Sequence, residues 1–206
     1  MFQTFNAPSD APAIPERIKR LRALLADEGL AALLLPRGDE HQGEYVAPCS
    51  ERLRWLTGFS GSAGLAAITR RHAGLFVDGR YTVQARAECG GGLFEFPGLA
   101  RTELASWLRA KLKDGDAVGF DPWLHTIAEA KALRDGAAKA GAGLVAVQRN
   151  LVDAIWHDRP APPLEPVTIH PLALAGELAK DKLSRLAEAT TARRASHVVL
   201  PDPSSI

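Results

Sequence analysis

The chain has 206 residues, a formal net charge of +1 and 46% hydrophobic residues. This length supports one well-buried core, or one core and part of another. A near-neutral charge argues against a dedicated nucleic-acid binder, which usually carries a clear positive excess. No apolar run reaches the roughly 18–20 residues of a membrane span, and the N-terminal residues lack the basic-then-apolar order of a secretory signal. We therefore expect a cytoplasmic globular protein without nucleic-acid or membrane partners.

The first elements follow directly from the spacing of apolar residues. Residues 14–29 predict a helix, since Ile14, Ile18 and Leu21 recur at helical spacing and Gly29 suits a helix stop. Residues 30–36, LAALLLP, are apolar on both faces, which is typical of a strand in the middle of a covered sheet. A polar segment follows, and then a short helix through Trp55 is expected.

The rest of the first 150 residues alternates between strand and helix patterns. Residues 64–69 and 73–78 predict two strands of a hairpin, and residues 80–88 predict a helix. Further strands are expected at residues 92–96, 117–121 and 143–147, and further helices at residues 100–112 and 126–140. This alternation predicts an α/β fold, with a mixed, mostly parallel sheet and helices on both faces.

Five prolines between Pro160 and Pro171 interrupt the pattern and indicate a linker or domain boundary. Beyond them, residues 180–201 repeat the helix, break, apolar strand and proline of residues 16–36. We predict a first domain over residues 1–159, a linker over 160–171 and the start of a similar second domain over 172–206. So short a unit cannot stand alone, which makes this chain the expected front part of a longer protein. Alternatively, the last helix and strand complete the first domain.

Several familiar sites are incomplete in this sequence. The glycines of residues 58–64, GFSGSAG, precede a strand, whereas a phosphate loop follows one, so we expect a tight turn with positive φ angles instead of a nucleotide site. His41 and Glu44 are three residues apart but lack an evident third metal ligand. Cys49 and Cys89 form no disulfide framework and are expected to be reduced. We therefore expect neither catalytic residues nor a metal site in this chain.

Arg80 is the residue that its local setting does not explain. It follows a predicted strand end in LFVDGRYTVQA, where Asp78 is expected to cap the next helix. A cation in a first helical turn is disfavoured by the helix dipole. A guanidinium fork suits a carboxylate or carbonyl partner. Either Arg80 binds a ligand, or it forms a structural ion pair, for which the sequence offers the acids Asp39, Glu40 and Glu44.

Three segments carry a resemblance to a known family: EYVAPCSERLRWLTGFSGSAGLAAIT, LFVDGRYTVQA and NLVDAIWHDRP. They resemble the N-terminal part of Xaa-Pro aminopeptidases (aminopeptidase P) of the three-domain cytosolic type, from about residue 14 onwards. The resemblance implies two creatinase-like domains followed by a "pita-bread" catalytic domain beyond Ile206. That domain would hold two divalent metal ions, expected to be manganese, which activate the water that cleaves before a penultimate proline.

The resemblance also implies roles for individual residues. In the family, the arginine of the Asp-Gly-Arg-Tyr motif reaches the peptide substrate, and here that position is Arg80. Glu44 and Tyr45 match the family in a loop expected near the same cleft. The parent enzyme is expected to be a homodimer, and this chain alone is expected to be inactive. The competing hypothesis is a stand-alone interaction module of the same fold.

Overall fold

The structure is a computed structural model that describes residues 12–89 and 92–200. It consists of two compact units, Met1–Pro162 and Pro163–Ile206, and each is described by itself. The boundary between them falls within the proline-rich segment. No helix in the described part of the chain is both long and apolar enough to cross a bilayer.

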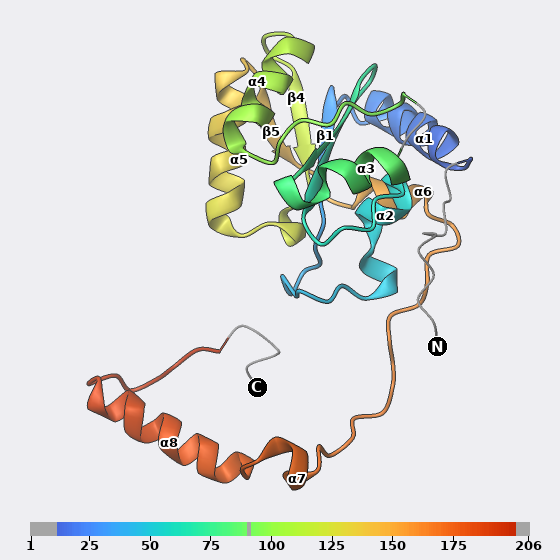
Figure 1. Ribbon diagram of the computed structural model, residues 1–206. Coiled ribbons are helices and arrows are strands. Elements are labelled where there is room, and N and C mark those ends of the chain that lie inside the picture. The colour runs from blue at the N-terminus through green and yellow to red at the C-terminus, as the bar shows by residue number, and fades with distance from the viewer. Residues whose placement is uncertain (1–11, 90–91, 201–206) are drawn as a thin grey trace. The chain divides into compact units, whose positions relative to one another are not determined.

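The first unit is built on a five-stranded sheet in the order β3-β2-β1-β4-β5 (Figure 1). Its strands are β1 (Ala32–Pro36), β2 (Gly64–Thr69), β3 (Ala73–Val77), β4 (Ala117–Phe120) and β5 (Gly143–Ala146). The pairs β1–β4 and β4–β5 are parallel, whereas β1–β2 and β2–β3 are antiparallel. The predicted mixed sheet is confirmed. The prediction that the sheet is mostly parallel is wrong, because two of its four strand pairs are antiparallel where the β2–β3 hairpin lies beside β1.

The strand predicted at residues 92–96 is reduced to isolated bridges. Glu95 pairs with Gly74, and Gly98 pairs with Val77, both in parallel orientation. Pro97 lies between these two bridges and has no N–H to donate, so a continuous ladder cannot form there. The segment therefore runs along the outer edge of β3 without becoming a full strand.

Helices cover both faces of the sheet, as predicted. The helices of this unit are α1 (Ile14–Asp27), α2 (Arg52–Thr57), α3 (Thr82–Glu88), α4 (Arg101–Lys111), α5 (Ile127–Lys139) and α6 (Leu151–Ile155). The described residues of the unit also include the 3-10 turns η1 (Pro48–Ser50), η2 (Gly79–Tyr81) and η3 (Pro122–Leu124). Figure 1 shows α4 and α5 together on one side of the sheet, with α1 and α6 on the other.

Strand β1 divides the interior into two cores. Leu33 and Leu35 pack with residues of α1, α2 and α6, whereas Ala32 and Leu34 pack with residues of α4 and α5. Alternate side chains of a strand point to opposite faces, so an all-apolar strand is needed where both faces are covered. The run LAALLLP was predicted to be central for this reason, and that prediction is confirmed.

The glycines of residues 58–64 form the expected tight turn before β2. Gly58 ends α2 with a positive φ of 81°. A Cβ at Gly61 would lie 2.8 Å from Cε2 of Phe59, whose ring is buried. A Cβ at Gly64 would meet the same ring. These glycines therefore let the backbone approach a core aromatic residue.

Replacing Gly61 with alanine is expected to lower the free energy of unfolding by about 1–3 kcal/mol, because the new methyl group forces the packed Phe59 ring to move. The measurement is urea unfolding followed by far-UV circular dichroism. Gly79→Ala is the matched control, since a methyl group added at Gly79 would have no other atom within 4 Å. Equal effects of the two substitutions would contradict this packing explanation.

The second unit contains α7 (Leu172–Ala175) and α8 (Ala179–Ala192) in its described residues. The strand predicted around residues 196–200 is wrong, because this segment has no regular secondary structure. A strand needs a neighbour for its backbone hydrogen bonds, and no other strand occurs among the described residues of this unit. The last part of the prediction, residues 201–206, lies outside the described residues.

Candidate functional site

Three connecting segments meet at one end of the strands, which we call the Arg80 edge of the sheet. Residues 37–47 follow β1, residues 58–63 precede β2, and residues 78–81 follow β3. The register aligns Pro36 with Leu65, and Gly64 with Val77. In addition, the backbone N–H of Arg37 donates to the carbonyl of Gly64 over 2.8 Å. The candidate residues Arg80, Glu44 and Tyr45 thus belong to loops that start from adjacent strand ends.

Arg80 lies in the turn η2, which Asp78 caps; the predicted helix cap thus holds this turn, and α3 itself begins only at Thr82. The Asp78 carboxylate accepts from the backbone N–H of Arg80 over 2.9 Å, and it pairs with Nη2 of the same residue over 2.6 Å. The Arg80 side chain is still 68% exposed, and its guanidinium lies 5.1 Å from the centroid of the Tyr81 ring. The acids that the sequence offered as partners, Asp39, Glu40 and Glu44, are not within ion-pair distance of Arg80 in the described structure.

The Arg80–Asp78 pair orients a charged group without burying it. Hydrogen bonding to Asp78 is the main reason that the pKa of Arg80 is raised, and the charge of Glu44 adds a smaller contribution in the same direction. The pair engages Nε and Nη2 of Arg80, and Nη1 has no hydrogen-bond partner among the described residues. The guanidinium can therefore donate to a carbonyl or carboxylate from solution.

Glu44 and Tyr45 lie in the loop that follows β1. Arg37 Nη1 donates to the Glu44 carbonyl over 2.9 Å, which holds the backbone of this loop, while both Glu44 and Tyr45 have exposed side chains. Tyr45 is 94% exposed. The Tyr45 ring therefore lies in solvent, and Glu44 acts on Arg80 only through its charge, as the smallest contribution to the raised pKa of Arg80.

Hydrogen bonds of Asp39 and Ser62 hold the loops on which these residues lie. Asp39 is buried and accepts from the backbone N–H groups of His41 and Gly43 at 3.0 and 3.1 Å. The Ser62 hydroxyl lies 2.7 Å from the Tyr81 hydroxyl, and this hydrogen bond lowers the pKa of Tyr81. The loops are therefore held at fixed points on both sides of Arg80.

A partly buried ion network anchors the far end of the Glu44 loop, and sequence reasoning missed it. Arg52 donates to Asp153 through Nε and Nη2 at 2.7 and 3.0 Å. Arg159 donates to Asp153 over 2.7 Å and to the Cys49 carbonyl over 2.6 Å. Burial alone would lower the pKa of Arg52, but the hydrogen bonds and charge of Asp153 outweigh it and raise that pKa. The motif NLVDAIWHDRP contains Asp153 and Arg159 and was the feature of the sequence that could have pointed to this network.

The cysteines are not candidate nucleophiles. Cys49 and Cys89 are free and buried. Burial raises the pKa of Cys89 to about 12, so its thiol is protonated at neutral pH. Among the described residues there is also no group of three or more His, Cys, Asp or Glu side chains that fits a metal ion.

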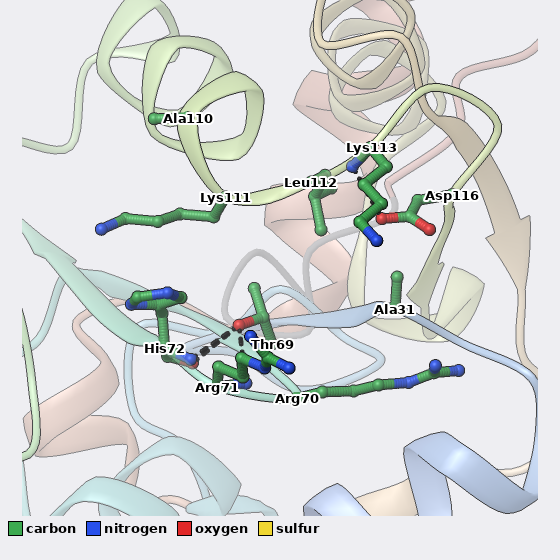
Figure 2. Close-up of a pocket in the computed structure, with 10 residues that line it drawn as sticks. All are labelled: Ala31, Thr69, Arg70, Arg71, His72, Ala110, Lys111, Leu112, Lys113 and Asp116. Carbon is green, nitrogen blue, oxygen red and sulfur yellow. Dashed lines mark hydrogen bonds between the residues drawn. The ribbon is translucent and has the colours of Figure 1, made fainter.

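A basic cavity of about 350 Å³ lies at the opposite ends of the strands (Figure 2). Its basic side chains do not converge on one point: Figure 2 shows Lys111 and Arg70 extending to opposite sides. Lys111 pairs with Glu95 over 2.9 Å, and Arg70 Nε donates to the carbonyl of Leu30 over 3.0 Å. These cations support the local structure, so we place the candidate site at the Arg80 edge.

Comparison with known proteins agrees with the fold. The family described as the Creatinase/Prolidase N-terminal domain matches residues 17–154. A probable Xaa-Pro aminopeptidase P from Aspergillus niger is 38% identical over 193 residues, which is 90% of this chain and 31% of that protein. This chain thus spans about a third of the length of the curated relatives that it matches.

Solved structures show the same relationship. The X-prolyl aminopeptidase from Caenorhabditis elegans, described as a cytosolic enzyme with a di-nuclear active site, superposes with a TM-score of 0.74 at 31% identity. The match covers 88% of this chain and 31% of that one. The N-terminal domain of the cytoplasmic peptidase PepQ from Mycobacterium tuberculosis matches with a TM-score of 0.52 at 26% identity, over 68% of this chain and 98% of that domain. The resemblance inferred from the sequence motifs is confirmed, and the chain belongs to the Creatinase/Prolidase N-terminal domain family.

Proposed function

We propose that this chain is the N-terminal, non-catalytic portion of a metal-dependent Xaa-Pro aminopeptidase. The observation that carries the proposal is the match to an Xaa-Pro aminopeptidase P over 90% of this chain but only 31% of the relative. The parent enzyme would remove the N-terminal residue from peptides with a penultimate proline, and it would be a cytoplasmic homodimer. Its first domain would cover residues 1–159, the linker residues 160–171 and the second domain would begin at residue 172.

Arg80 is the residue that we propose contacts the peptide. Its guanidinium is exposed yet oriented by Asp78, so little conformational freedom remains to be lost when a substrate binds. Nη1 would donate to a carbonyl or to the terminal carboxylate of a short peptide. Glu44 and Tyr45, on the neighbouring loop, would line the same cleft and narrow access to the reacting bond.

The catalytic chemistry would come from elsewhere in the parent enzyme. Two divalent metal ions, expected to be manganese, would activate a water molecule when bound. The described residues of this chain offer no cluster that fits such ions, so their ligands would belong to the remaining part of the protein. The residues of this chain would position the peptide and take no part in proton transfer.

The activity of the purified chain tests this division of roles. With manganese present, the 206-residue chain is expected to leave Gly-Pro and Arg-Pro-Pro peptides intact, whereas the full-length protein is expected to cleave them before proline. Cleavage by the 206-residue chain, at a rate that follows the chain through purification, would overturn the assignment of a non-catalytic role. A full-length protein without any such activity would favour the interaction-module hypothesis instead.

A further inference from the structure

A second cavity lies between the sheet and the helices α4 and α5, beside the end of β1. We call it the α4–α5 pocket; it has a volume of about 320 Å³. Its largest apolar lining residues are Leu65, Phe76, Leu99, Leu104 and Leu133. This size and composition match sites for small molecules, which are mostly apolar with a few polar groups. In open α/β sheets, ligands bind at the ends of strands where the chain connections diverge, and β1 is such a strand here.

His125 lines this pocket. Its Nε2 is buried and has no hydrogen-bond partner among the described residues. The ring packs against Phe120, with centroids 5.7 Å apart. Burial lowers the pKa of His125 and outweighs the opposing charges of Glu129 and Asp121, so the imidazole is neutral at pH 7. Nε2 is closed off from solvent and therefore from a ligand, so His125 contributes its ring surface to the pocket wall, and its NMR signal can report on binding.

Two opposite charges stand at the same pocket. Arg101 lies in the first turn of α4, where the helix dipole disfavours a cation, and it has no ion-pair partner among the described residues. Glu129 lies in the first turn of α5 and uses only Oε2 to accept from the N–H and hydroxyl of Thr126, at 2.8 and 2.9 Å. Its Oε1 has no partner in the described part of the chain. Arg37 also lines the pocket, but it is engaged with the Glu44 carbonyl and the Glu51 carboxylate, so the described residues leave one available cation and one available carboxylate oxygen.

We propose that the α4–α5 pocket binds a small zwitterion with an apolar body, which is the chemistry of a free apolar amino acid. The ligand carboxylate would meet Arg101, the ammonium group would meet Glu129, and the apolar side chain would rest on the leucine and phenylalanine floor beside the His125 ring. A simple carboxylate would face Glu129, and a simple amine would face Arg101, so neither matches the pocket as well. The contacts proposed here, to Arg101 and Glu129, are not those proposed for Arg80, Glu44 and Tyr45, so this proposal does not depend on the proposed function, although Arg37 and Ser62 of the neighbouring loops also line the pocket.

The test compares three probes that share one branched apolar group, L-leucine, isocaproate and isoamylamine, in titrations of the 206-residue chain. The readout is the imidazole NMR signal of His125, assigned with a His125→Phe variant. We expect L-leucine to bind with a dissociation constant on the order of 1 mM. Isocaproate lacks the ammonium group and isoamylamine lacks the carboxylate, so each is expected to bind about tenfold more weakly.

Charge-removing variants assign each contact. Arg101→Gln is expected to abolish the preference for leucine over isoamylamine, and Glu129→Gln the preference for leucine over isocaproate. Glutamine preserves the capping box, so the second variant should keep the α5 start intact. Arg134→Gln, an exposed arginine on α5 that does not line the pocket, is the matched control. The proposal is overturned if leucine causes no saturable shift in the folded chain, if isocaproate binds as tightly as leucine, or if the control loses as much affinity as Arg101→Gln.

Discussion

Replacing Asp153 with alanine is expected to lower the free energy of unfolding by about 3–5 kcal/mol, because it leaves a buried cation without its partner. The Arg52 side chain is only 8% exposed and has a bidentate contact with Asp153. Arg159 shares the same carboxylate. The loss should be measured by urea unfolding, with tryptophan fluorescence and circular dichroism as independent probes of one transition.

The matched control is Asp135→Ala, which removes an exposed carboxylate from the Lys131–Asp135 pair on α5. Exposed pairs of this kind contribute little, so no resolved change in stability is expected. An Asp153→Ala variant as stable as this control would show that the buried network does not hold the first unit together. The experiment would also report on the Glu44 loop, since Arg159 binds the Cys49 carbonyl at its far end.

Much of the fold follows from local patterns in the sequence. The apolar periodicity of residues 14–29 predicts α1 nearly to the residue, and the two-sided apolar run before Pro36 predicts the central strand. These predictions succeed because the spacing of apolar residues along a short segment shows whether one face of a helix or both faces of a strand are buried. The cap formed by Asp78 was also predictable, since it joins residues two positions apart.

The errors arise where distant residues decide the outcome. The segment 196–200 has the composition of a strand but lacks a neighbouring strand in the described part of its unit, and composition alone cannot supply one. Similarly, Arg52 and Asp153 are 101 positions apart, so their pairing was not visible in local spacing. The burial of His125 Nε2 without a hydrogen-bond partner likewise arises from tertiary packing, which no motif encodes.

The candidate site was predicted in part. Sequence reasoning selected Arg80 because a cation stood at the start of a helix, and the structure places it in the turn before α3. The ion-pair partners considered were distant acids, whereas the actual partner is the adjacent Asp78. The consequence for function is specific: the local pair leaves the guanidinium exposed, which a buried structural ion pair would not.

Arg80→Ala in the full-length protein is expected to lower kcat/KM for Arg-Pro-Pro by about 10–100-fold, the range that corresponds to losing one charge-assisted contact. The effect should fall mainly on KM if Arg80 binds the peptide equally in the ground and transition states. Stability should not change, because the side chain is exposed and its only ion-pair partner among the described residues is Asp78. Arg80→Lys, which keeps the charge but loses the planar fork, should recover part of the loss.

The most direct test is therefore the ratio of kcat/KM between the wild-type enzyme and Arg80→Ala, measured with manganese and Arg-Pro-Pro, beside Arg71→Ala. Arg71 is an exposed arginine at the opposite edge of the sheet, so its removal makes the same change in net charge away from the candidate site. We predict a ratio of about 10–100 for Arg80→Ala and near 1 for Arg71→Ala. Kinetics unchanged by Arg80→Ala, or lowered equally by both substitutions, would contradict a substrate contact from this domain.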